Sequence, residues 1–100
     1  MLKDRRYELI GPMISAGRVH HFRDLFYYIP KTIVARDLGI NNVRFSRLID
    51  DVEDYSLKDL LRMATLMEIE PHSLLKLVLD QWAADKKAKR LPGQRRVAEP

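Results

Sequence analysis

The chain has 100 residues, of which 46% are apolar and 32% charged, and its formal net charge is +4. This length suits one domain, and the composition excludes a collagen-like or wholly disordered chain. Cysteine is absent, which excludes disulfides and thiolate metal sites. No apolar run approaches the ~20 residues that span a bilayer, and the first residues lack the apolar stretch of a secretory signal. We therefore expect a cytoplasmic protein without a membrane partner.

The charges are segregated along the chain. Residues 1–50 hold nine basic and five acidic residues, residues 51–85 hold three and eight, and residues 86–100 hold six and one. A basic first half and a basic tail suit a protein that presents one face and one appendage to a polyanion such as nucleic acid. Simple solvation of the surface explains the same pattern, so charge alone does not decide between them.

Apolar residues recur at intervals of three and four along the chain, which predicts an all-α fold of five or six helices. We expect a first helix from Tyr7 to Ile14, bent or broken at Gly11-Pro12 because proline lacks an N–H, and ended by Gly17. A second short helix must stop near Pro30. Its buried stripe consists of Phe22, Leu25, Phe26 and Ile29.

The third and fourth predicted helices follow almost without a connection. The third covers Lys31–Leu38 and is halted by Gly39, since glycine readily takes the positive φ of a tight turn. The fourth begins near Asn41 or Asn42, because an asparagine oxygen can accept hydrogen bonds from the first backbone N–H groups of a helix. This helix is expected to end near residue 50.

The fifth predicted helix begins with a capping box formed by Ser56 and Asp59, with Tyr55 and Leu60 as its hydrophobic staple. It ends near Glu68, which must either take a left-handed conformation or let the helix continue. Its expected inward face consists of Leu57, Leu60, Leu61, Ala64 and Met67.

Pro71 suits the first position of the sixth helix. The apolar pattern of this helix stops at Trp82, and fraying followed by disorder is expected beyond it. We therefore divide the chain into a domain over residues 1–85 and a basic, flexible tail over residues 86–100. The apolar residues of the sixth helix are Leu74, Leu75, Val78, Leu79 and Trp82.

The most informative segment is Lys31–Leu48, which is expected to form two short helices joined by a turn. Two helices that cross steeply need a small residue where they approach, here Ala35, and a glycine at the turn, here Gly39. Their inner sides are formed by Val34, Leu38, Ile40, Phe45 and Leu48. The side chains left pointing outward are Asn42, Val43, Arg44, Ser46 and Arg47.

This segment resembles the lambda-repressor-like helix-turn-helix family of phage repressors and Cro proteins. The resemblance covers about residues 22–78 and continues through Ser56-Leu57, Leu60-Leu61 and Ala64 to Leu74-Leu75. It implies a bundle of five to six helices with an extra N-terminal helix over residues 1–17. The helix-turn-helix pattern matches in ungapped register at Val34, Ala35, Leu38, Gly39, Ile40, Phe45, Ser46, Arg47 and Leu48.

The resemblance implies sequence-specific binding of double-stranded DNA, with the helix that starts near Asn41 in the major groove. The side-chain chemistry agrees. An amide such as Asn42 can pair with adenine, an arginine with guanine O6 and N7, and Val43 with a thymine methyl, each good bidentate pair contributing about 1–3 kcal/mol of discrimination. The expected DNA-binding residues are Lys31, Thr32, Asn41, Asn42, Val43, Arg44, Ser46 and Arg47.

The individual contacts leave alternatives open. Arg47 precedes Asp51 by one helical turn, so an exposed ion pair competes with DNA contact, whereas Arg44 has no acidic residue four positions later and is favoured for direct readout. Val43 is equally well explained as an ordinary exposed apolar residue. Lys31 and Arg36 are expected to add affinity without sequence information.

Two classes of function remain. The first is a transcriptional regulator that binds a two-fold DNA site as a homodimer. The second is a protein-interaction module, such as an antitoxin-like component with weak DNA binding, which the acidic segment 50–54 suggests. Trp82 either closes the core against the first helix or belongs to a self-association surface. We expect no enzymatic activity, cofactor or metal site, because no nucleophile elbow or phosphate loop is present and His20 and His21 lack a third ligand.

Overall fold

The computed structural model describes residues 3–89, and all regular secondary structure in that range is helical, which confirms the all-α prediction. None of these helices is long and apolar enough to cross a membrane. The elements in chain order are α1 (Tyr7–Ser15), the 3-10 helix η1 (Phe22–Tyr27), α2 (Lys31–Leu38), α3 (Asn42–Asp50), the 3-10 helix η2 (Val52–Asp54), α4 (Leu57–Met67) and α5 (Pro71–Lys89).

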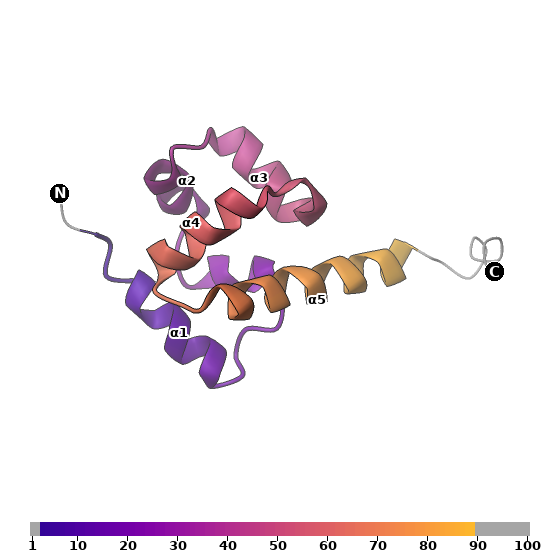
Figure 1. Ribbon diagram of the computed structural model, residues 1–100, viewed down its shortest axis with the longest axis horizontal. Coiled ribbons are helices and arrows are strands. Elements are labelled where there is room, and N and C mark those ends of the chain that lie inside the picture. The colour runs from indigo at the N-terminus through magenta and orange to yellow at the C-terminus, as the bar shows by residue number, and fades with distance from the viewer. Residues whose placement is uncertain (1–2, 90–100) are drawn as a thin grey trace.

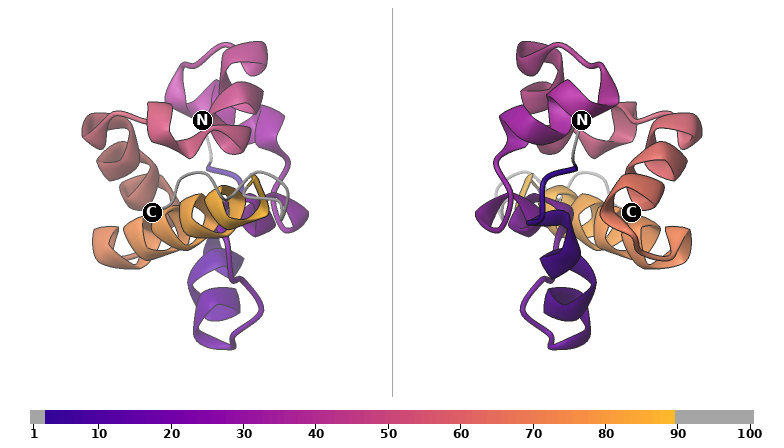
Figure 2. Two further views of the ribbon diagram at one scale, coloured as in Figure 1. Left: turned by 90° about the vertical axis from the view of Figure 1, so that its right-hand side faces the viewer. Right: turned by 90° about the vertical axis from the view of Figure 1, so that its left-hand side faces the viewer.

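The helices α2 and α3 form one end of the molecule, and α1 lies at the opposite end (Figure 1). Between them, α4 packs against α1, α2 and α5, while α5 also contacts η1 and η2. The second half of α5 projects beyond the body of the bundle (Figure 1). Figure 2 shows that α4 and the first turns of α5 lie on one side of the molecule and η1 on the other. The α2–α3 pair is therefore supported from below by several elements.

A group of four aromatic rings ties this pair to the bundle. Phe22 and Phe26 of η1 stand edge to face at 5.3 Å between centroids. Phe26 packs on Phe45 of α3 at 5.6 Å, and Phe22 packs on Tyr55 at 5.3 Å. Edge-to-face pairs at such distances are favourable beyond the area that they bury, so η1, α3 and the start of α4 are fixed relative to one another.

One prediction about the N-terminal elements needs correction, and a second, the short helix before Pro30, is made more specific. The first helix is not broken at Pro12, because α1 runs from Tyr7 to Ser15 with the proline inside it. The segment Phe22–Tyr27 is a 3-10 helix and not an α-helix. Its buried stripe is nevertheless largely as predicted, since Phe22, Leu25 and Ile29 are fully buried, and a 3-10 helix also places residues three apart on one side.

The predicted inward face of α4 is only partly correct. Leu57 and Leu61 are 66% and 45% exposed. Ala64 and Met67 are buried as predicted, and the helix buries Met63 beside them, because it packs against α1, α2 and α5 on that side. Of the two alternatives expected at Glu68, a left-handed residue or a continued helix, the structure has the first: α4 ends there, with Glu68 at φ 58° and ψ 44°.

The sixth predicted helix continues further than expected. It runs as α5 to Lys89, so the prediction that the chain frays after Trp82 is wrong for residues 83–89; residues 90–100 lie outside the described part. Alanine and lysine, which favour helices, make up most of this segment, and lysines near the helix C-terminus complement the helix dipole. The residues that α5 buries are Leu74, Leu77, Val78 and Gln81.

Candidate nucleic-acid interface

The connection between α2 and α3 is a three-residue turn with defined hydrogen bonds. Gly39 has φ 73° and ψ 29°, and the Ile40 N–H donates to the Ala35 carbonyl at 2.9 Å. Asn41 then caps α3, because its Oδ1 accepts from the N–H groups of Val43 at 2.8 Å and Arg44 at 3.2 Å. The glycine stop and the asparagine cap are therefore both as predicted.

The inner side of the α2–α3 pair agrees with the sequence pattern. Ala35 is fully buried where the small residue was expected. The close packing of α2 on α3 is consistent with that small side chain. The predicted inner residues Val34, Leu38, Ile40, Phe45 and Leu48 are all buried.

The outer side carries the predicted DNA-binding residues. Lys31 and Thr32 are exposed at the first turn of α2, whose backbone N–H groups at these two positions have no acceptor within residues 3–89. In α3, Ser46 is half-buried, and Asn41 is exposed with its side-chain oxygen engaged in the cap. The remaining predicted residues of α3, Asn42, Val43, Arg44 and Arg47, are exposed.

An ion pair was considered for Arg47 and not for Arg44, and the structure shows the reverse. Within the described residues, the Arg47 side chain makes no ion pair or hydrogen bond, so the considered pair with Asp51 is not formed. Arg44, in contrast, has its Nη2 3.9 Å from the Asp59 Oδ2 of α4. Spacing along one helix identifies ion-pair partners only on that helix, whereas this partner lies fifteen residues ahead on α4.

Two residues outside the predicted site hold the α2–α3 pair in place. Arg62 of α4 donates from Nη2 to the Leu38 carbonyl at 2.7 Å, which satisfies the C-terminus of α2. Gln81 of α5 is fully buried. Its Nε2 donates to the Ile49 carbonyl of α3 at 2.6 Å, and its Oε1 accepts from the Arg23 N–H at 2.7 Å. The signal for this contact in the sequence is a polar residue, Gln81, at a helical position that the apolar pattern of the last helix predicts to be buried.

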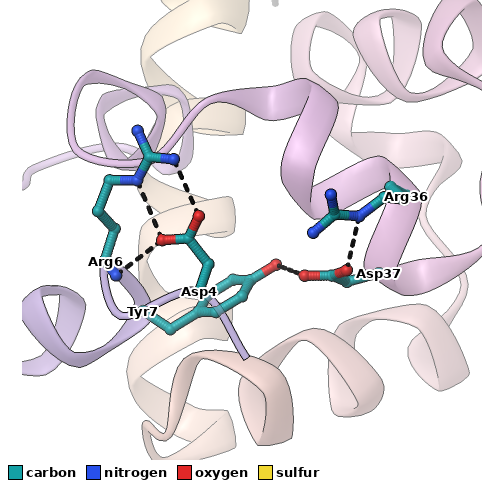
Figure 3. Close-up of polar contacts among 5 residues, drawn as sticks. All are labelled: Asp4, Arg6, Tyr7, Arg36 and Asp37. Carbon is teal, nitrogen blue, oxygen red and sulfur yellow. Dashed lines mark hydrogen bonds and ion pairs between the residues drawn. The ribbon is translucent and has the colours of Figure 1, made fainter. Parts of the chain in front are cut away.

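The N-terminal helix is joined to α2 by a chain of polar contacts (Figure 3). The Tyr7 hydroxyl donates to the Asp37 Oδ2 at 2.7 Å, and the Arg36 Nε donates to the Asp37 Oδ1 at 3.1 Å. Burial, reinforced by the hydrogen bond to Asp37, raises the pKa of Tyr7 above its ordinary value. Arg36, expected to contact phosphate, is therefore already paired with a neighbouring carboxylate.

A second ion pair lies beside this chain of contacts (Figure 3). Arg6 donates from Nε to the Asp4 Oδ1 at 3.0 Å and from Nη2 to the Asp4 Oδ2 at 2.9 Å. The hydrogen bonds from Arg6 lower the pKa of Asp4 to about 2. This pair is exposed, so it orders the approach to α1 more than it stabilises the fold.

The charges around α3 differ between its two ends. Its first turn carries Arg44 and no carboxylate, whereas Asp50 ends its last turn and Asp51 and Glu53 follow it. The Trp82 Nε1 of α5 donates to the Glu53 Oε2 at 2.6 Å. A polyanion is therefore attracted to the first half of α3 and repelled from the region beyond its C-terminus.

A separate exposed surface is apolar. We call it the apolar face and define it by four leucines: Leu57 and Leu61 of α4 and Leu75 and Leu79 of α5, which are 37–66% exposed. Leu57, Leu61 and Leu75 line a hollow together with Leu60, Pro71 and His72. Neighbouring exposed apolar residues of this kind mark interaction surfaces more often than isolated ones do.

Within residues 3–89, no cluster of three or more histidine, cysteine or acidic side chains could hold a metal ion. Comparison of the chain with known protein families, with curated proteins and with solved structures gives no match. The case for a function therefore depends on the geometry of the chain itself.

Proposed function

We propose that this chain is a cytoplasmic, sequence-specific DNA-binding protein of the lambda-repressor-like helix-turn-helix type, which regulates transcription by placing α3 in the major groove. One observation carries the proposal. The first turns of α3 present an amide, an isopropyl group and two guanidinium groups to solvent, on a helix capped by Asn41 and packed on its other side into the core. Hydrogen-bonding groups in that position are those that read base edges in this docking mode.

The side chains divide into two groups by their expected contacts. Asn42 and Arg44 read base edges, and Val43, which is 62% exposed, meets a thymine methyl. Asn41 contributes only its Nδ2, because its oxygen is used by the cap. Lys31 and Thr32 bind phosphate together with the N–H groups of the first turn of α2, which adds affinity without sequence information.

The apolar face supports a homodimer as the binding unit. Leu75, Leu79 and Trp82 recur at intervals of four and three along α5, so they share one side of the helix, and each is at least 37% exposed. Trp82 therefore does not close the core against α1; its indole N–H contacts η2 instead. A two-fold contact through this side supplies the two copies of α3 that a two-fold DNA site requires, with half-sites about 34 Å apart.

The alternative remains a protein-interaction module of the antitoxin-like kind. It is favoured by the hollow beside Trp82, whose lining has one cation, Lys86, and four carboxylates, so that it suits a basic partner more than DNA; the carboxylates are those of Asp50, Asp51, Glu53 and Asp85. The two functions use different surfaces, so one chain can carry both. Copurification of a protein partner, with no duplex binding at low salt, would select this alternative.

The decisive experiment is selection of bound duplexes from a random pool, followed by salt-dependent affinities for the selected and a random duplex. Arg44→Ala is expected to remove the preference at one base pair, whereas Lys31→Ala weakens all sequences alike and lowers the salt slope by about 1. Lys87→Ala, on the exposed side of α5, is the matched control for loss of a cation. Equal loss on both duplexes for Arg44→Ala would contradict base readout by this residue.

A further inference from the structure

Asp59 is held in a fixed position next to the recognition surface. It is the third residue of α4, and its backbone N–H donates to the Ser56 Oγ at 3.1 Å, so the capping contact fixes its backbone. Its side chain is only 14% exposed, although it lies near the surface. Its Oδ2 lies 3.9 Å from the Arg44 Nη2 and its Oδ1 lies 3.9 Å from the Arg62 Nη1.

The Asp59 carboxylate has two guanidinium groups near it but a hydrogen bond from neither. Within residues 3–89 its oxygens accept no hydrogen bond, and both ion pairs are at the outer limit of contact. A carboxylate that has lost most of its water needs a close cationic partner. The buried hydroxyl of Tyr55, whose pKa burial raises, also has no partner there, and the charges of both Asp59 and Arg44 act on it.

We propose that Asp59 is a positioning residue for Arg44: it holds one edge of the guanidinium against α4 so that the opposite edge is directed outward, toward a guanine in the major groove. The inference rests on the proposed function and adds a determinant of its specificity. A guanidinium has N–H donors on several edges and can bind a carboxylate and a base at the same time. An arginine restricted before binding loses less conformational freedom when it reads its base.

The second arginine of α3 provides an internal comparison. Arg47 has no carboxylate within contact distance in the described part of the chain and is exposed. Its side chain can therefore follow either a phosphate or a base edge, depending on the sequence. Arg44 can contact a base only in the orientation that Asp59 imposes on its guanidinium. Its base preference is therefore sharper than that of Arg47.

The test is Asp59→Asn, compared with Asp51→Asn. Both changes remove one negative charge near α3 and preserve side-chain volume, but Asp51 is exposed and its side chain makes no hydrogen bond or ion pair within residues 3–89. Asp51→Asn is expected to strengthen binding to all duplexes alike. Asp59→Asn is expected to reduce preference by about 3- to 10-fold at the base pair whose preference Arg44→Ala abolishes, the size of effect typical of contacting residues. If Asp59→Asn instead acts on all sequences alike, as Asp51→Asn does, the proposal is overturned.

A second measurement needs no DNA. In the unbound protein, nitrogen-15 relaxation of the Arg44 Nε–H group is expected to show restricted motion, which increases in Asp59→Asn and is unchanged in Asp51→Asn. Unchanged Arg44 mobility in a folded Asp59→Asn protein overturns the positioning role, whatever the DNA results. Absence of duplex binding by the unmodified protein overturns the proposed function instead, so the two failures are distinguishable.

Discussion

Gln81 gives the sharpest test of how the bundle supports α3. Its amide joins three elements, because it lies on α5, donates to the Ile49 carbonyl of α3 and accepts from the Arg23 N–H of η1. We consider Gln81→Met, which keeps a long unbranched side chain and removes both hydrogen-bonding groups. The perturbation leaves one carbonyl and one N–H without their partner while changing the packing little.

The expected cost follows from the burial of these two groups. A buried polar group left unsatisfied costs about 1–3 kcal/mol, so two such groups set an upper range of about 2–6 kcal/mol. The contact to Ile49 is buried, but the contact to Arg23 is only partly buried, and water can replace it at lower cost. We therefore expect a loss of about 2–4 kcal/mol from a total of about 5–15 kcal/mol for a domain of this size.

The assay is urea and thermal unfolding followed by circular dichroism, with fluorescence of Trp82 as a second probe close to the mutated site. A loss of this size lowers the Tm by roughly 10–30 °C. Lys87→Met, on an exposed position of the same helix, controls for the new methionine and is expected to change stability by no more than about 0.5 kcal/mol. An equally small effect of Gln81→Met would refute the argument from unsatisfied groups.

A companion variant, Gln81→Glu, tests the same contact through pH. The introduced carboxyl can accept from the Arg23 N–H in either form but can donate to the Ile49 carbonyl only when protonated. Burial and the facing carbonyl raise its folded pKa above the unfolded value of about 4.3. Its contribution to stability is therefore fully present below the unfolded pKa and lost as pH rises through the folded one. Stability of this variant that does not improve on acidification, relative to the parent, would contradict the contact.

Three further predictions concern other parts of the chain. Glu68→Gly is expected to raise the free energy of unfolding by about 0.5–1 kcal/mol, because glycine accepts the left-handed conformation at φ 58° without strain. The ion pair with Lys3 that the change removes is exposed and contributes little. Thermal unfolding measures the effect, and a destabilised variant would contradict the argument. Tyr7→Phe is expected to lower the free energy of unfolding by about 1 kcal/mol. It is also expected to reduce the loss of stability above pH 10 in urea unfolding, because the raised Tyr7 pKa favours the folded state only while the phenol is protonated. If the dependence of stability on pH above pH 10 is the same in the variant and the parent, this role of Tyr7 is excluded. Leu79→Asp is expected to convert a dimer into a folded monomer in light scattering, and an unchanged mass would remove the apolar face from the interface.

Local signals in the sequence were sufficient for the elements nearest the candidate site. The bounds Lys31–Leu38, the stop at Gly39 and the cap at Asn41 depend on interactions within four or five residues, and each is found as predicted. Periodicity also identified which side of α2 and α3 is buried. The predicted side of α4 was less accurate, because Leu57 and Leu61 are as apolar as the residues that the helix buries. A pattern of leucines shows that a helix is amphipathic, but the packing of its neighbours selects which stripe is covered.

Contacts between distant parts of the chain could not be read from the sequence. The Arg44 and Asp59 pair, the Arg62 bond to Leu38 and the Gln81 bridge join residues 15 to 58 positions apart. The same holds for the tyrosine of α1 that reaches the aspartate at the end of α2. These contacts determine how rigidly the outer residues of α3 are held.

The sequence by itself determined the helical class, the limits of α2 and α3 and the identity of the side chains on their outer surface, because helix formation, capping and glycine conformation depend on near neighbours. Only the tertiary structure decided that Arg44 has a carboxylate beside it while Arg47 has none, and that four leucines stay exposed. The physical reason is that burial and charge pairing depend on which helices come together in space, and the spacing of residues along the chain does not specify that arrangement.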